Sequence, residues 1–216
     1  MDDIVPQEKK WKGKFGKEYT LRNLKTLKEI DKLYLENFGI TRTKLNREFI
    51  GNLNRSIKIL EVGANVGIQL AFLQKMGFKN LCGIEINRKA IELSKSFTKN
   101  IEIIQGMAQD NPFKDNYFDL VFTSGLLIHI PSSKIEKVMA EIHRVAKKYI
   151  WGFEYSADKY TMVLYRGKKN MLWKTNFPQL YLNFFRDLKL VKEKKCKYLL
   201  NNENINSMFL LGKIKK

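Results

Sequence analysis

Ile59-Leu60-Glu61-Val62-Gly63-Ala64-Asn65-Val66-Gly67 is the stretch that decides the fold of this chain. An apolar run with one acid leads into a glycine turn, and a helical pattern follows. Glycine is needed there because the backbone must bend sharply and let a ligand lie against it. The full G-x-G-x-x-G of a dinucleotide site is absent, because Asn65 occupies the place of the middle glycine. Asparagine tolerates left-handed φ better than most residues, so we expect the turn to form.

Two acids accompany this turn. Glu61 lies near the end of the buried strand, where a carboxylate is costly unless it orders something, either the turn or the ammonium group of a ligand. Glu85 ends the next apolar strand, 18 positions after Gly67. A carboxylate there can accept hydrogen bonds from both ribose hydroxyls. The alternative is a structural turn beside an exposed strand-end glutamate.

The Glu61–Gly67 stretch resembles the first motif of class I S-adenosylmethionine-dependent methyltransferases, and Glu85 matches their ribose-binding acid. Residues 105–113 are similar to the third-strand loop that borders adenine, and residues 117–125 resemble the fourth strand and its exit. The resemblance covers roughly residues 55–155 and the final strand pair. It implies S-adenosylmethionine as cofactor and S-adenosylhomocysteine as product.

The cofactor-binding residues that we expect lie along one edge of the sheet and in an N-terminal segment. Met107 stands where many members carry aspartate and cannot accept the adenine amino proton, so apolar contact is expected there and backbone contact from Ala108. Residues 11–23 place glycines and aromatics before a helix, which looks like a folding lid, with a structural helix as the alternative. The expected set is Tyr19, Arg22, Glu61, Gly63, Ala64, Asn65, Gly67, Glu85, Ile86, Met107, Ala108, Thr123 and Ser124, in which Tyr19 and Arg22 hold the cofactor carboxylate.

The remaining pattern predicts an α/β fold. Strands are predicted at residues 57–62, 80–85, 101–105, 118–123, 149–155, 188–197 and 207–213, and helices at 67–75, 88–97 and 132–146. This alternation implies a Rossmann-like, seven-stranded, mostly parallel sheet with helices on both faces. Residues 1–55 are expected to form a helical lid, and residues 56–216 the methyltransferase domain with an aromatic and basic insertion at about 156–187.

The acceptor is expected beside the exit of the fourth strand, where its nucleophile must be aligned with the methyl group. His129 follows that exit and can deprotonate a hydroxyl or amine near neutral pH, although its apolar neighbours favour a packed structural histidine. Glu154 and Tyr155 end the fifth strand, and Glu154 is either an acceptor-orienting group or a solvated acid. In the insertion, Tyr165-Arg166 and Trp173-Lys174 put aromatics beside cations, which suits sugar or base stacking with phosphate pairing, or else an ordinary aromatic core. The catalytic candidates are His129, Glu154 and Tyr155, and the substrate-binding candidates are Tyr165, Arg166, Trp173 and Lys174.

The net charge of +18 allows a nucleic-acid partner but does not favour one. The basic residues are mostly scattered lysines, and lysine, asparagine and isoleucine are raised together, as A/T-rich codons would produce. Residues 123–131 also lack the Asp/Asn-Pro-Pro-aromatic motif of DNA amino-methylases. Only Cys82 and Cys196 are present, without metal-ligand spacing, so no metal and a reducing cytoplasmic setting are expected. No apolar run approaches the roughly 18–20 residues that span a bilayer.

A narrower resemblance covers nearly the whole chain. The lead at 11–23, the segment at 125–130 and the set at 154–177 are similar to the pseudaminic acid biosynthesis-associated methylases. This resemblance implies transfer to a nonulosonic-acid sugar, its nucleotide-sugar form or a precursor. The alternatives are an RNA methyltransferase and a non-catalytic S-adenosylmethionine-binding partner in a biosynthetic complex.

Overall fold

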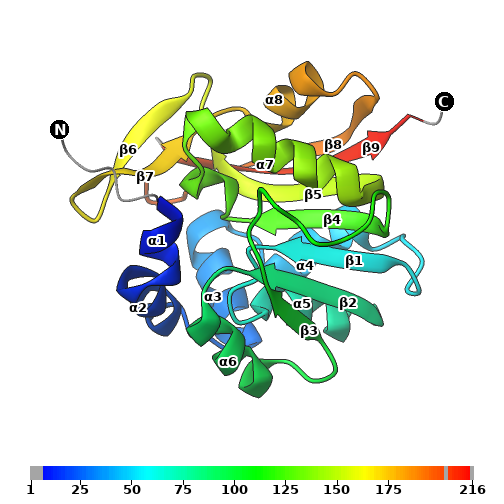
Figure 1. The fold of residues 1–216 in the computed structure, drawn as a ribbon, viewed down its shortest axis with the longest axis horizontal. Coiled ribbons are helices and arrows are strands. Elements are labelled where there is room, and N and C mark those ends of the chain that lie inside the picture. Colours follow the sequence, from blue (N-terminus) through cyan, green and yellow to red (C-terminus); the bar gives the residue numbers. More distant parts are fainter. Residues whose placement is uncertain (1–6, 202–203, 215–216) are drawn as a thin grey trace.

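A computed structural model describes residues 7–201 and 204–214, and a seven-stranded sheet in the order β3-β2-β1-β4-β5-β9-β8 forms its centre (Figure 1). The strands from β1 to β5 pair in parallel, and β9 pairs antiparallel with both β5 and β8. This confirms the predicted Rossmann-like sheet. The strands are β1 Lys58–Val62, β2 Asn80–Glu85, β3 Glu102–Gln105, β4 Phe118–Ser124, β5 Ala146–Ser156, β8 Leu188–Lys197 and β9 Ile205–Lys213.

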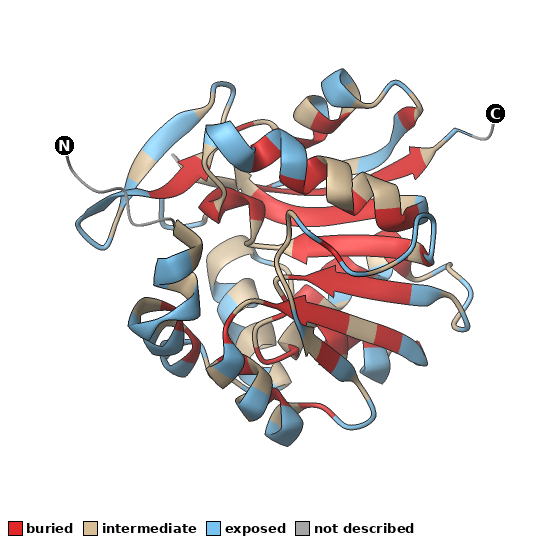
Figure 2. Cartoon of the chain, in the orientation of Figure 1, coloured by how far each residue is buried: buried red, intermediate tan, exposed pale blue. Residues whose placement is uncertain are grey.

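Helices cover both faces of this sheet, so its central strands are buried on both sides (Figure 2). Alternation along β1 sends Ile59 into one core cluster, with α4 and α5, and Leu60 into another, with α7 and α8. Burial on both faces explains why these strands read as continuous apolar runs in the sequence. The helices after β1 are α5 Ile68–Lys75, α6 Arg88–Phe97, α7 Ser132–Val145 and α8 Phe177–Phe184.

The N-terminal part forms four helices of two kinds, namely α1 Gln7–Lys12, α2 Lys14–Arg22, α3 Leu27–Phe38 and α4 Arg42–Ile50. A capping box of Thr26 and Glu29 starts α3, and α4 packs into the core through residues such as Leu45. α3 has no fully buried residue but packs Tyr34 and Phe38 against the core cluster, whereas α1 buries no residue and α2 buries only Gly16 and Thr20. Within the segment expected as a lid, only α1 and α2 therefore lie on the domain as a cover; we call these two helices the lid.

The insertion contains a β-hairpin, β6 Thr161–Tyr165 and β7 Lys168–Lys174, where no strand was predicted. Its two-residue turn is made by Arg166 and Gly167, whose φ values are both positive, at 51° and 73°. Positive φ at both central residues suits the right-handed twist of the flanking strands. The aromatic and basic composition of this segment hid the alternation that marks a hairpin.

Two features are absent from the residues that the structure describes. No helix there is both long and apolar enough to cross a bilayer. In the same part of the chain, no three or more His, Cys, Asp or Glu side chains gather as they would to hold a metal ion.

Candidate active site

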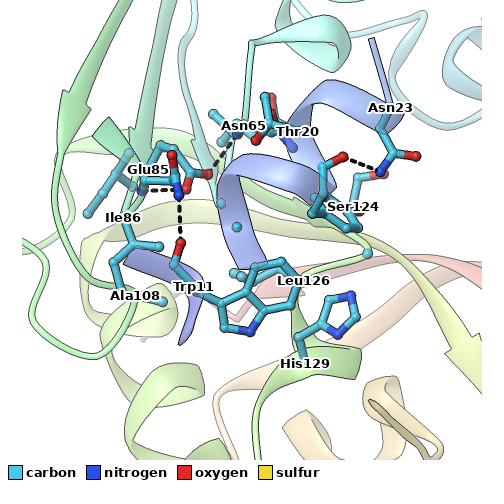
Figure 3. A pocket seen from close by; sticks show the side chains of 18 of the residues that line it. Trp11, Thr20, Asn23, Asn65, Glu85, Ile86, Ala108, Ser124, Leu126 and His129 are labelled. Atoms are coloured by element: carbon cyan, nitrogen blue, oxygen red, sulfur yellow. Dashed lines mark hydrogen bonds between the residues drawn. The ribbon is translucent and has the colours of Figure 1, made fainter. Parts of the chain in front are cut away.

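A cavity of about 350 Å³ lies at the carboxyl ends of the strands, beneath the lid (Figure 3). The turn after β1, the end of β2, the loop at 106–109 and the exit of β4 contribute its walls. This is where the strand order reverses between β1 and β4, the usual ligand crevice of an open α/β sheet. The volume is in the range of small-molecule sites.

The turn between β1 and α5 needs the residues that the sequence supplies. Gly63, Asn65 and Gly67 have φ values of 76°, 49° and 78°, which confirms the left-handed asparagine. A Cβ on Gly63 would lie 2.7 Å from Leu126 Cδ1, and one on Gly67 would lie 2.7 Å from Thr98 Cγ2. Gly63 lines the cavity together with Ala64, whereas Gly67 lies behind it and shapes the turn.

Glu85 is fixed by backbone donors on both sides. Its Oε2 accepts from the Asn65 amide at 2.8 Å, and its Oε1 accepts from the Asn87 amide at 2.8 Å. Burial raises the pKa of Glu85, and these two hydrogen bonds oppose that rise. Because each carboxylate oxygen has a second lone pair, Glu85 can still accept from the two hydroxyls of a ribose. This is the place expected from the sequence.

Three buried oxygen atoms around the turn have no hydrogen-bond donor among the residues that the structure describes: Glu61 Oε2, Asn65 Oδ1 and Gln69 Oε1. All three residues line the cavity. Burial raises the pKa of Glu61 well above its ordinary value, and the nearby Arg42 opposes this rise. Buried acceptors are normally satisfied, so this group fits a ligand that brings several N–H donors, as an ammonium group does.

Arg42 is a site residue that the sequence pattern did not indicate. Its Nη1 donates to Tyr34 Oη at 2.9 Å and to Ser124 Oγ at 3.3 Å, and both of these residues line the cavity. The side chain is fully buried, and its Nη2 has no partner. Arg22, the predicted carboxylate ligand, is instead exposed and does not line the cavity, while Tyr19 does.

The expected adenine side follows β2 and β3. Ile86 and Ala108 line the cavity as predicted, and Gln109 is an addition. Met107 faces a smaller neighbouring pocket instead, beside Lys12. Met107 also forms an isolated antiparallel bridge with Asp110.

His129 lines the cavity at the exit of β4. Its Nδ1 lies 2.7 Å from Met171 O, and a carbonyl can only accept, so Nδ1 carries the proton and Nε2 keeps its lone pair. The rings of Trp11 and Tyr165 lie 4.6 Å and 5.4 Å from the imidazole. Burial lowers the pKa of His129 to about 4, so the imidazole is neutral at physiological pH.

The other two predicted catalytic residues do not line this cavity. Glu154 accepts hydrogen bonds from the amides of Leu126 at 3.2 Å and Ile128 at 3.4 Å, and also from the Thr123 side chain. Its complete burial raises its pKa to about 7. Glu154 and Thr123 thus position the β4 exit loop from behind. Tyr155 accepts a hydrogen bond from Tyr198 Oη at 3.3 Å and is likewise outside the cavity.

The predicted substrate residues are dispersed, because they belong to a hairpin. The ring of Tyr165 packs near His129. It also packs against Phe15 of the lid, and the centroids of the Tyr165 and Phe15 rings are 6.4 Å apart. Arg166 is exposed in the hairpin turn, and Trp173 is buried. Lys174 lies over the Tyr155 ring at 5.4 Å. Of these four residues, Tyr165 is thus the one with a ring contact to His129.

The sheet order, the glycine turn and the strand-end Glu85 define the class I methyltransferase fold. Residues 60–149 match the family model of a methyltransferase domain, and this match supports S-adenosylmethionine as the cofactor. The chain spans less than half the length of the curated relatives that follow. An uncharacterized methyltransferase of Synechocystis is 29% identical over 42% of this chain and 42% of the relative. The 24-methylenesterol C-methyltransferase 2 of Arabidopsis thaliana is 33% identical over 42% of this chain and 26% of the relative.

One solved structure with a similar fold was determined with ligands bound. It is the 1,6-didemethyltoxoflavin-N1-methyltransferase of Burkholderia thailandensis with bound 1,6-didemethyltoxoflavin and S-adenosylhomocysteine. Its TM-score is 0.63 at 12% identity, with 80% of this chain and 77% of that chain covered. At this identity the likeness shows the fold alone.

Proposed function

We propose that this protein transfers the methyl group of S-adenosylmethionine to a small anionic acceptor whose reacting atom lies beside His129. The observation that carries the proposal is the fixed tautomer of His129, whose unprotonated Nε2 can accept a hydrogen bond in the wall of the cofactor cavity. The cavity thus has a ribose-type carboxylate from β2 in one wall and a hydrogen-bond acceptor after β4 in another.

The cofactor would be held by residues that fit its separate parts. Glu85 would accept from the ribose, and Glu61, Asn65 and Gln69 would accept from the ammonium group. Ser124 and Tyr34, polarised by the buried Arg42, would bind the carboxylate. Gly63, Ala64, Ile86, Ala108 and Gln109 would form the remaining walls.

The bound cofactor supplies an electrophilic methyl group, and the chain supplies alignment and exclusion of water. Trp11 and Tyr19 of the lid close the cavity above His129. The Nε2 of His129 can accept a hydrogen bond from an acceptor O–H or N–H and so orient the lone pair that attacks. Because burial holds the pKa of His129 at about 4, orientation is its main contribution and proton removal a minor one.

The acceptor that we propose is a nonulosonic-acid sugar, its nucleotide-sugar form or a precursor. The resemblance of segments 11–23, 125–130 and 154–177 supports this choice. Enclosure by the lid also favours a small acceptor over a polymer, and Tyr165 is placed to stack on it. The cytoplasm, where sugar precursors are activated, is the location that we propose for this reaction.

An RNA methyltransferase is the second candidate, and one observation favours it. Lys9, Lys10, Lys14 and Lys17 are exposed on the lid, and none of them lines the cavity. Clustered cations of this kind bind phosphate by counterion release.

Labelling separates the two candidates. The protein would be incubated with methyl-tritiated S-adenosylmethionine and size-fractionated bacterial extract. We expect label in small, phosphatase-sensitive anionic molecules, and label in nuclease-sensitive polymer would overturn the sugar assignment.

His129→Asn should lower kcat by about 10²-fold while S-adenosylhomocysteine affinity is unchanged. Lys99→Ala, at an exposed position in the loop after α6, serves as the matched control.

A further inference from the structure

Asn87 follows Glu85, the carboxylate proposed to bind the ribose, and contacts three separate parts of the molecule. Its backbone amide donates to Glu85 Oε1 at 2.8 Å. Its Oδ1 accepts from the amides of Lys89 and Ala90 and so caps α6. Its Nδ2 donates to Trp11 O of the lid at 2.7 Å. Asn87 is buried, so each of these contacts is shielded from water.

The lid is shaped to reach this contact. A Cβ on Gly16 would lie 1.9 Å from Trp11 O and 2.6 Å from Asn87 Nδ2. Any side chain at position 16 would therefore separate the acceptor from the donor. Glycine in a helix is unfavourable by itself, so its presence within α2 is explained by this approach.

The lid has further contacts with the domain, including the ring contacts of Trp11 with His129 and of Phe15 with Tyr165. Glu8 contacts Lys134 and Gln109, and Gln7 contacts His129 O. With six residues and none buried, α1 is too short to be stable without such contacts. The donor on Asn87 is thus the contact that joins Trp11 of the lid to the segment that follows Glu85.

We propose that Asn87 is a positioning residue that couples closure of the lid to occupancy of the ribose site. The inference rests on the proposed cofactor site. A ribose on Glu85 fixes the carboxylate that receives the Asn87 amide, and this steadies the backbone from which Nδ2 reaches Trp11 O. Closure in turn brings Trp11 to 4.6 Å from the His129 ring, so the acceptor pocket is completed only over a nucleoside. Because such coupling is reciprocal, weakening the contact also weakens cofactor binding.

Hydrogen–deuterium exchange of residues 7–22 tests this, with and without S-adenosylhomocysteine. Asn87→Asp keeps the oxygen that caps α6 and replaces the donor by an oxygen facing Trp11 O; Asn87→Ser keeps a capping hydroxyl and removes the donor. We expect the ligand-induced protection factor of the lid amides to be about tenfold smaller in each variant than in the wild type. The ligand should also dissociate about tenfold faster from each variant. Asn176→Asp, which alters the analogous cap of α8, is the matched control.

The outcomes distinguish the coupling from the cofactor site itself. If the wild-type protein binds no S-adenosylhomocysteine, the proposed function fails. If the ligand binds and both Asn87 variants protect the lid as the wild type does, the coupling is refuted. Loss of protection in residues 88–97 as well as in the lid would show that only the α6 cap was damaged, and this also refutes it. At equal occupancy, adenosine should protect the lid and adenine should not.

Discussion

The neutral state of His129 predicts a specific loss of stability in acid. Burial lowers its pKa from 6.5 to about 4. The folded protein therefore resists protonation of this group, which the unfolded chain accepts readily. At 1.36 kcal/mol per pKa unit, the neutral histidine contributes about 3 kcal/mol to the free energy of unfolding above pH 6.5. Since the folded pKa is lowered, this contribution is lost as the pH falls from 6.5 towards 4.

Urea unfolding between pH 4 and pH 7.5 measures this, with His129→Asn as the comparison. Asparagine can still donate to Met171 O but does not titrate. The stability of the His129→Asn variant therefore lacks the pH-dependent contribution of the histidine. The rings packed on the imidazole belong to Trp11, Tyr19 and Tyr165, and both proteins retain them. We expect the difference in unfolding free energy between the two proteins to change by about 3 kcal/mol over the range. Parallel curves would refute the neutral buried imidazole.

Three further results are expected. Burial raises the pKa of Glu154 from 4.5 to about 7, so ionisation opposes folding, and stability should fall by up to about 3 kcal/mol as the pH rises from 4.5 to 7; in urea titrations Glu154→Gln should lack this slope. Gly67→Ala should lower the unfolding free energy by about 2–4 kcal/mol, because the new Cβ is strained at positive φ and contacts Thr98. Gly167→Ala, with open space around it, should lower the unfolding free energy by only about 1 kcal/mol in the same assay. Arg42→Lys should weaken S-adenosylhomocysteine binding about tenfold and leave 5′-methylthioadenosine binding unchanged in calorimetry, because only the first ligand has a carboxylate; equal losses for both ligands would contradict the assignment.

The sheet could be predicted because its strands obey simple rules. β2 and β8 have the predicted bounds. The other strands of the sheet differ from the prediction at their ends only, where apolar residues of the strand border polar ones. The β6–β7 hairpin was not predicted, because the aromatic and basic pairs Tyr165-Arg166 and Trp173-Lys174 also fit a pattern of ligand contacts. In the structure, Arg166 instead provides a turn conformation and Trp173 provides buried packing.

The cavity residues divide in the same way. Glu85 and Asn65 follow directly from strand ends and the turn, because the carboxyl ends of parallel strands meet at one edge. Arg42 and Asn87 could not be found by spacing, since their roles depend on which way a helix-end side chain points after packing. Glu154 also ends a strand, but its side chain lies under the β4 exit loop, and no pattern in the sequence distinguishes that direction from the cavity.

The distribution of buried charge bears on how the cavity would treat substrate and product. Glu61 and Glu85 are both buried in its wall, within a protein whose net charge is +18. Burial raises the pKa of each carboxyl, so a positive ligand beside them recovers part of the lost solvation. S-adenosylmethionine carries a sulfonium charge that disappears on transfer, while both carboxylates remain. The same residues that attract the cofactor should therefore hold S-adenosylhomocysteine less tightly, and this favours product release once the lid opens.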